Sequence, residues 1–128
     1  MTDISKGAAG EVIAARFLRE KGYRIIASNY RSRFGEIDII AADKKYIVFV
    51  EVKTRSESAA YAPRETVTAA KQSKIAKTAL HYLQCNSHDL QPRFDVIEIL
   101  TERNNPMKTV ELDHIRNAFE TEGMHFSI

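Results

Sequence analysis

Two β-branched runs decide the fold: Glu36–Ala42 (EIDIIAA) and Ile47–Thr54 (IVFVEVKT), joined by the polar loop Asp43–Tyr46 (DKKY). Residues of this kind favour strands, and a short polar loop between two such runs predicts a β-hairpin. If the loop sets the register, cross-strand partners have residue numbers that sum to 89. Asp38 then lies directly opposite Glu51, on the same face of the sheet.

Helices and further strands are expected on both sides of this hairpin. Helical spacing predicts one helix from Thr2 or Ser5 to Lys21, ended by Gly22, and a second from about Arg64 to Gln84. Shorter signals predict the remaining elements. In chain order they are a strand at 23–29, a turn-rich connection at 31–35, a mobile loop at 56–64, strands at 93–101 and 109–112, and a last helix at 113–119 capped by Asp113. The order αβββαββα predicts an α/β fold with a mixed central β-sheet flanked by α-helices, in a single domain over residues 1–128.

Composition restricts the class of protein. The chain has 128 residues, 44% hydrophobic and 28% charged, with one cysteine, as expected for one soluble globular domain in a reducing compartment. Since no apolar run is long enough to span a bilayer and the N-terminus lacks the pattern of a signal peptide, we expect a cytoplasmic protein without membrane contact. Residues 1–56 carry eleven basic and seven acidic side chains, a pattern that fits either a nucleic-acid footprint or a solvated surface.

Three ionisable side chains lie within the hairpin strands. Glu51 and Lys53 are two residues apart and share a face, and the expected register adds Asp38 to them. Two adjacent carboxylates need a cation between them, and hard oxygen ligands suit Mg²⁺ or Mn²⁺. The alternative is a cross-strand ion pair, Asp38–Lys53 or Glu51–Lys53, on a solvent-facing surface.

Two polar residues occupy the apolar sides of the predicted helices. Glu11 falls in the same arc as Ile4, Ala15 and Leu18, and Gln72 shares a side with Ala76, Ala79 and Leu83. Each is a candidate for the site. The alternatives are a carboxylate satisfied by a backbone amide or an arginine for Glu11, and an amide that caps a loop for Gln72.

The spacing His81-x3-Cys85-x2-His88 resembles a metal motif, but it lacks a clear fourth ligand. Nothing marks Cys85 as a nucleophile of lowered pKa. Neither feature is taken as the site.

An ordered series of motifs runs along nearly the whole chain and resembles the YraN-like family of predicted endonucleases. The series comprises Gly7-x-x-Gly10-Glu11, Gly22-Tyr23, Asn29-Tyr30-Arg31, Gly35 to Ile40, Phe49 to Arg55, Lys71-Gln72-x-x-Ile75, Arg93 to Val96 and Ile115-x-Asn117-Ala118-Phe119. That family is similar to the archaeal Holliday-junction resolvases and to the PD-(D/E)xK, or restriction-endonuclease-like, superfamily. Ile37 stands where the motif name has proline.

The resemblance implies a restriction-endonuclease-like fold and a metal-dependent phosphodiesterase. Asp38, Glu51 and the backbone carbonyl of Val52 would bind Mg²⁺ or Mn²⁺, with Glu11 supporting the ion directly or through water. Lys53 would position the attacking water, and Gln72 would match a polar helix residue of the superfamily. DNA is the expected substrate, with branched or junction DNA among the forms considered, and junction cutting would require a homodimer.

Basic side chains near the expected site would contact the phosphate backbone of DNA without reading its sequence. They are Arg31, Arg33, Arg55, Arg64, Lys71 and Lys74. Two other functions remain open. One is a catalytically silent nucleic-acid-binding module with a nuclease fold, and the other is a small interaction protein with an ion-paired hairpin.

Overall fold

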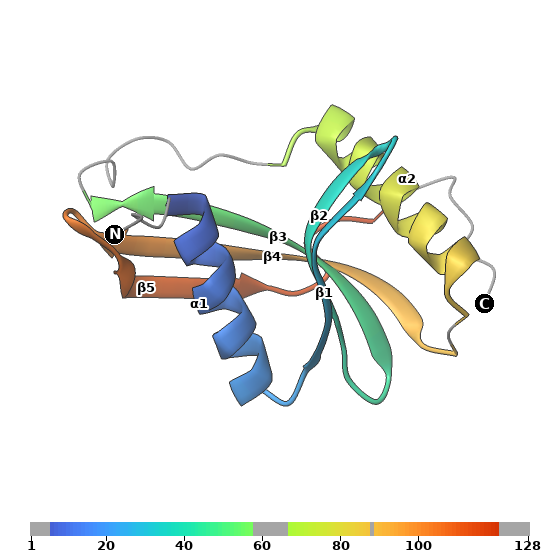
Figure 1. Ribbon diagram of the computed structural model, residues 1–128, viewed down its shortest axis with the longest axis horizontal. Coiled ribbons are helices and arrows are strands. Elements are labelled where there is room, and N and C mark those ends of the chain that lie inside the picture. The colour runs from blue at the N-terminus through green and yellow to red at the C-terminus, as the bar shows by residue number, and fades with distance from the viewer. Residues whose placement is uncertain (1–5, 58–66, 88, 121–128) are drawn as a thin grey trace.

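The computed structural model describes residues 6–57, 67–87 and 89–120. Two helices and five strands follow one another in the order α1, β1, β2, β3, α2, β4, β5 (Figure 1). Their bounds are α1 Lys6–Glu20, β1 Arg24–Ser32, β2 Gly35–Ala42, β3 Tyr46–Ser56, α2 Ala69–Cys85, β4 Gln91–Glu102 and β5 Asn105–Ile115. None of the described helices is long and apolar enough to cross a membrane.

The strands form one mixed sheet in the order β1-β2-β3-β4-β5. All neighbours are antiparallel except β3 and β4, which run parallel and are joined through α2. A parallel pair needs such a crossover, because a tight turn cannot return the chain to the same end of the sheet. The α/β class and the mixed sheet with flanking helices are confirmed, and the architecture is compatible with a restriction-endonuclease-like fold.

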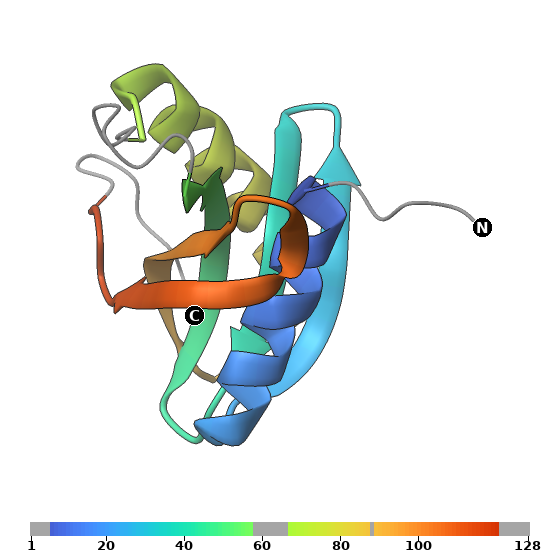
Figure 2. The ribbon, with the colours of Figure 1, turned by 90° about the vertical axis from the view of Figure 1, so that its left-hand side faces the viewer.

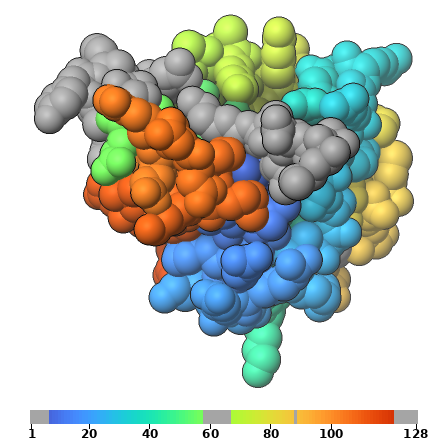
Figure 3. Space-filling view, turned by 60° about the vertical axis from the view of Figure 1, so that its left-hand side comes forward, coloured from blue at the N-terminus to red at the C-terminus, as the bar shows by residue number. Residues whose placement is uncertain are grey.

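The two helices cover opposite faces of the sheet (Figures 1 and 2). On the α1 face, Leu18 packs with Val48 and Val50, and on the α2 face Ile75 packs with Phe49. Consecutive residues of β3 therefore enter different cores, which is why its sequence is almost continuously apolar. The β4–β5 hairpin lies beside α1 on the surface (Figure 3).

A buried polar network ties β4 to β5 and to Tyr23, which lies between α1 and β1. Asp95, fully buried, accepts hydrogen bonds from Arg93 Nε and Nη2 at 2.9 and 2.8 Å and lies 2.7 Å from His114 Nε2. Tyr23 accepts a further bond from Arg93 Nη2. Although burial alone would raise the pKa of Asp95, the hydrogen bonds from His114 and Arg93 hold it below its ordinary value.

The expected last helix is wrong. Asp113 does not cap a helix but lies within β5, paired with Glu98, and the strand continues to Ile115. Residues 116–120 that follow are turn and irregular chain, with Asn117 at φ 50° and its N–H donated to Asp95. The ladder of residues 109–115 with β4, and the contacts of half-buried Leu112 and His114 with the α1 side of the core, outweigh the local capping signal.

Other boundaries shift by a few residues. The second helix begins at Ala69, not near Arg64, because Thr68 Oγ1 accepts a hydrogen bond from Lys71 N and caps it. The first strand reaches Ser32, so the connection to β2 is shorter than expected. Gly22, at φ +94°, ends the first helical segment in the left-handed conformation as predicted.

Candidate active site

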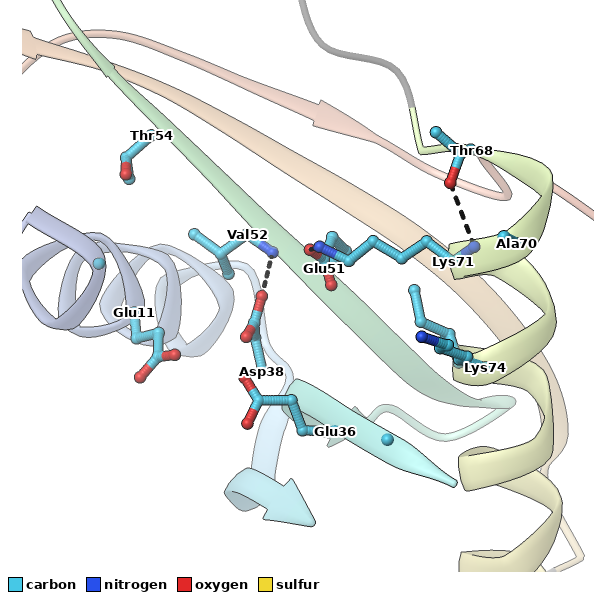
Figure 4. Close-up of a pocket in the computed structure, with 13 residues that line it drawn as sticks. Glu11, Glu36, Asp38, Glu51, Val52, Thr54, Thr68, Ala70, Lys71 and Lys74 are labelled. Atoms are coloured by element: carbon cyan, nitrogen blue, oxygen red, sulfur yellow. Dashed lines mark hydrogen bonds and ion pairs between the residues drawn. The ribbon is translucent and has the colours of Figure 1, made fainter. Parts of the chain in front are cut away.

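A pocket of about 580 Å³ lies where β2 and β3 separate, between the first turns of α1 and the N-terminal end of α2 (Figure 4). Glu11 reaches it from α1, and Lys71 and Lys74 reach it from α2. Because the strands part at this point, helices on opposite faces of the sheet contribute to the same pocket. The full lining is Gly7, Glu11, Gly35, Glu36, Asp38, Glu51, Val52, Thr54, Thr68, Ala70, Lys71, Lys74 and Ile75.

The predicted register of the hairpin is confirmed over four pairs, from Ile39↔Val50 to Ala42↔Ile47. Beyond them, a continued ladder would pair Val52 with Ile37. Instead, the N–H of Val52 donates to Asp38 Oδ2 at 2.8 Å. The carboxylate of Asp38 thus takes the place of the backbone carbonyl that would accept this N–H in a continued ladder. It is held at the point where β2 and β3 separate.

The electrostatic surroundings of Asp38 favour its protonated form. Burial raises the pKa of this carboxyl from the ordinary 3.8 to about 7, and the hydrogen bond from Val52 offsets only part of the rise. The nearby carboxylates of Glu51, Glu11 and Glu36 contribute to the same rise. A carboxylate with this set of neighbours is ionised at neutral pH only at a cost, unless a cation joins it.

Glu51 is the most buried carboxylate of the pocket, at 7% exposed. Its Oε1 lies 2.6 Å from Nζ of Lys71, which extends across the pocket from α2 (Figure 4). The hydrogen bond with Glu51 raises the pKa of Lys71 above its ordinary value, and burial opposes this rise. One ammonium group therefore already compensates one of the acidic side chains.

Glu11 is placed by the close approach of α1 to β3. A Cβ atom at Gly10 would overlap the side chain of Thr54, so only glycine lets the helix come this near. The half-buried carboxylate of Glu11 then accepts a hydrogen bond of 2.9 Å from Asn29 Nδ2. Asn29 itself has a φ of 53°, a conformation that asparagine adopts more readily than most residues.

Two predicted site residues lie outside the pocket lining. Lys53 follows Glu51 by two residues on β3, so it shares the face of Glu51, and it is half-buried opposite Glu98 of β4. Gln72 donates from Nε2 to the carbonyl of Val67 at 2.9 Å, which fixes the chain just before α2. This contact matches the alternative considered for Gln72, a side-chain amide that caps a loop.

The predicted phosphate-binding residues do not all gather at the pocket. Lys71 and Lys74 line it, whereas Arg31 forms an exposed ion pair of 3.1 Å with Glu36 and Arg33 stacks on the ring of Phe34 at 4.8 Å. Arg55 is half-buried near the end of β3, and Arg64 and most of the predicted 56–64 loop lie outside the described residues. His81, of the zinc-like spacing, is 2.9 Å from the hydroxyl of Tyr30 through Nδ1, and His88 is not described.

The chain matches a known protein family over a stretch that contains the charged residues of the pocket. Residues 10–99, which contain Glu11, Asp38, Glu51 and Lys71, match the profile described as "Uncharacterised protein family UPF0102". The chain belongs to the UPF0102 family. This is the YraN-like family that the sequence motifs resemble.

Individual UPF0102 proteins are similar over almost their full length. The UPF0102 protein of Chlorobium phaeobacteroides is 47% identical over 118 residues, covering 90% of this chain and 94% of its own. That of Caldanaerobacter subterraneus subsp. tengcongensis is 48% identical over 116 residues, covering 88% and 93%, and that of Alkaliphilus oremlandii is 48% identical over 117 residues, covering 88% and 96%.

Sequence reasoning missed three features of this UPF0102 site. Glu36 joins the acidic cluster, and its position two residues before Asp38 on the same strand could have indicated it. The contact between Lys71 and Glu51 had no such signal, since the two residues are twenty positions apart and belong to different elements, β3 and α2. Asn29, the partner of Glu11, falls inside a quoted motif but carried no predicted role.

Proposed function

We propose that this protein is a metal-dependent endonuclease of the PD-(D/E)xK superfamily, which hydrolyses phosphodiester bonds in DNA, with branched or junction DNA among the substrates to test. The observation that carries the proposal is the charge of the pocket. Four carboxylates, from Glu11, Glu36, Asp38 and Glu51, face two ammonium groups, from Lys71 and Lys74. With all six ionised, the lining carries two negative charges. Because Arg31, outside the lining, pairs with Glu36, the carboxylates left for a divalent cation are Glu11, Asp38 and Glu51.

The donor atoms fit a hard cation. Asp38 and Glu51 offer carboxylate oxygens, and the carbonyl of Val52 points to the same side of β3 as its N–H, toward Asp38. Over residues 6–57, 67–87 and 89–120, no three His, Cys, Asp or Glu side chains form a ready-made metal cage. Mg²⁺ commonly takes one or two carboxylates and keeps several waters, so a pair of carboxylates with one carbonyl is a sufficient set.

A bound Mg²⁺ or Mn²⁺ would supply Lewis-acid stabilisation of a scissile phosphate and a more acidic water. The residues of the chain have separate tasks around it. Asp38 and Glu51 bind the ion, with Glu11 supporting it directly or through water. Lys53 orients the attacking water and offsets the charge that develops on the phosphate. Gln72 holds the start of α2, from which Lys71 reaches the pocket.

Phosphate contacts beyond the pocket complete the proposal. Lys74 lines the pocket, and Arg31 and Arg33 lie at the β1–β2 turn, next to Gly35 of the lining. Arg55 and Arg64 would extend the contacts along the chain that follows Glu51. Such contacts hold a backbone without reading bases, so we expect selection by DNA structure. Paired incisions in a junction would need a homodimer.

Cleavage of labelled DNA tests the proposal. Single-stranded, duplex, flapped and four-way-junction substrates are incubated with Mg²⁺ or Mn²⁺ and the wild type, Lys53→Ala or Lys44→Ala. Lys44 lies in the exposed β2–β3 loop, so its variant makes the same change away from the pocket. We expect the wild type and Lys44→Ala to cut alike and Lys53→Ala to lose at least a hundredfold in rate.

The opposite outcomes are equally informative. Binding of DNA without cutting by any of the three proteins would favour the silent nucleic-acid-binding module. Equal cutting by Lys53→Ala and the wild type would remove Lys53 from the reaction. If neither DNA nor Mn²⁺ binds, the interaction protein with an ion-paired hairpin is the better description.

A further inference from the structure

The ion pair between Glu51 and Lys71 is unequal in its surroundings. The Glu51 side chain is 8% exposed and sits on the central strand β3, whereas the Lys71 side chain is 47% exposed and extends from the surface of α2. The carboxylate is therefore fixed and shielded from water. The ammonium group hangs on a flexible stem that can turn toward solvent, at the cost of leaving Glu51 without its cation.

The position of the Lys71 ammonium is the second observation. It lies 2.6 Å from Glu51 Oε1, and the charge of nearby Asp38 also stabilises its protonated form. The stem of Lys71 spans the pocket from α2 to β3 (Figure 4). An ion held by Asp38 and Glu51 would occupy the same negative region, and two cations in contact there would repel each other.

We propose that Lys71 is a built-in counter-ion of Glu51, which occupies the cation position in the metal-free protein and is displaced when a divalent ion binds. This inference rests on the proposed metal-binding function. It assigns Lys71 a positioning role that differs from simple phosphate contact: the residue keeps the buried carboxylate compensated and sets the threshold for metal binding. Once displaced, its ammonium group remains within the pocket and can meet a phosphate there.

The inference has an unusual consequence for affinity. Removing Lys71 deletes a competitor of the metal, so Mn²⁺ should bind about tenfold more tightly to Lys71→Gln than to the wild type. A loss of one positive charge anywhere near the pocket would also help a cation to bind. Lys77→Gln makes the same change of charge on the same helix, at an exposed residue outside the pocket lining, and controls for that effect.

Calorimetric titration with Mn²⁺ at pH 8 tests the inference on four proteins: the wild type, Lys71→Gln, Lys71→Arg and Lys77→Gln. Only Lys71→Gln should bind about tenfold more tightly, because Lys71→Arg keeps a cation beside Glu51. Thermal melting gives a second readout. In EDTA, Lys71→Gln should melt below Lys77→Gln, since Glu51 loses its cation, and saturating Mn²⁺ should raise its melting temperature by more than that of the wild type.

The outcomes separate the inference from the proposed function. If the wild type binds Mn²⁺ but Lys71→Gln binds it equally or more weakly, Lys71 is not a competitor and the inference fails, while the metal site stands. If none of the four proteins binds Mn²⁺, the proposed metal-dependent function fails and the inference fails with it. Because Lys71→Arg retains the charge, a tenfold gain in that variant would also overturn the counter-ion role.

Discussion

Val52 and Asp38 are joined by a hydrogen bond of 2.8 Å, from backbone N–H to carboxylate, at the point where β2 and β3 part. The bond fixes a side chain whose charge the pocket disfavours. The carboxylates of Glu51, Glu11 and Glu36 and the burial of Asp38 all raise its pKa, which reaches about 7. The ionised form of Asp38 therefore lowers the stability of the folded protein, and the same surroundings would favour a cation beside it.

The first prediction concerns the stability of the metal-free protein. The pKa of Asp38 is about 7 when folded and 3.8 as an unperturbed side chain, so the folded state holds the proton more tightly. Stability therefore falls as pH rises from about 4 to 7, and the full penalty is present above pH 7. Asp38→Asn removes the charge and keeps an oxygen for the N–H of Val52. In EDTA at pH 8, it should be more stable than the wild type by about 1–3 kcal/mol.

Urea unfolding at pH 5 and pH 8 measures this difference. At pH 5 the folded carboxyl is protonated but the unfolded one is already mostly ionised, so the gain from Asp38→Asn should shrink to about a third to a half of its value at pH 8. Asp89→Asn makes the same change at an exposed carboxylate before β4 and should alter stability little at either pH. If Asp38→Asn is less stable than the wild type at pH 8, the pocket does not disfavour the ionised form of Asp38.

The second prediction concerns the pH dependence of metal binding. In the proposed metal site an ion would bind the ionised form of Asp38, whose pKa is about 7, so binding below that pH would release a proton. The affinity for Mn²⁺ should rise about tenfold from pH 5.5 to 6.5 and level off above pH 7.5. Calorimetry in buffers of different ionisation enthalpy counts the released protons. An affinity that does not change from pH 5.5 to 8 would remove Asp38 from the ligand set.

The hairpin could be predicted in detail because short-range chemistry determines it. Asp43 Oδ1 accepts the N–H groups of Lys45 and Tyr46 at 2.8 and 2.7 Å, so the four-residue loop closes in one way and the register that sums to 89 follows. The helical spacing of apolar residues in α1 likewise indicated Glu11, because this carboxylate falls within the apolar side of the helix. In these cases the residues that interact lie within one element or one turn, where spacing determines geometry.

The features that could not be predicted from the sequence depend on contacts between residues far apart in the chain. Asp113 has the character of a helix cap, yet the ladder with Glu98 and the contacts of its strand with α1 keep it in β5. The separation of β2 from β3 beyond Ile39 could not be foreseen from two continuous apolar runs. It depends on the carboxylate of Asp38 taking the N–H of Val52, an interaction between side chain and backbone that periodicity does not encode.

The third prediction tests how α1 is held against β3. At Gly10 an added Cβ would overlap the methyl group of Thr54, whereas at Gly7 no atom lies within 4 Å of it. Gly10→Ala should lower the free energy of unfolding by about 1–3 kcal/mol. Gly7→Ala should leave it unchanged or raise it by up to about 1 kcal/mol, because alanine favours a helix more than glycine does.

A rescue variant isolates the cause. Thr54→Ser deletes the methyl group that Gly10→Ala would meet, so the double variant should regain most of the lost stability. Chemical denaturation of the two single variants and the double variant gives the coupling between the sites. If the two effects simply add, close packing of Gly10 on Thr54 is not what keeps α1 near the pocket.

The fourth prediction compares a buried ion pair with an exposed one. Asp95 is fully buried and accepts two hydrogen bonds from Arg93, which is itself only 9% exposed, whereas Glu102 and Lys108 form a pair of 3.2 Å with side chains 43% and 67% exposed. Asp95→Ala leaves the guanidinium buried without its carboxylate and should cost about 3–5 kcal/mol. Glu102→Ala should cost at most about 1 kcal/mol, because water already solvates both partners.

The pH dependence of the Asp95 effect follows from its lowered pKa. A carboxyl whose pKa is lower in the folded state adds stability above its unfolded value of 3.8, and that stability is lost as pH falls through the folded value. The gap between the wild type and Asp95→Ala should therefore stay wide at pH 5 and close only in strongly acidic solution. The gap for Asp38→Asn should instead narrow steadily from pH 7 down to about pH 4. Guanidinium unfolding from pH 3 to pH 8 records both profiles. Parallel profiles for the two variants would mean that the pocket and the β4–β5 network do not hold their carboxylates in opposite electrostatic states.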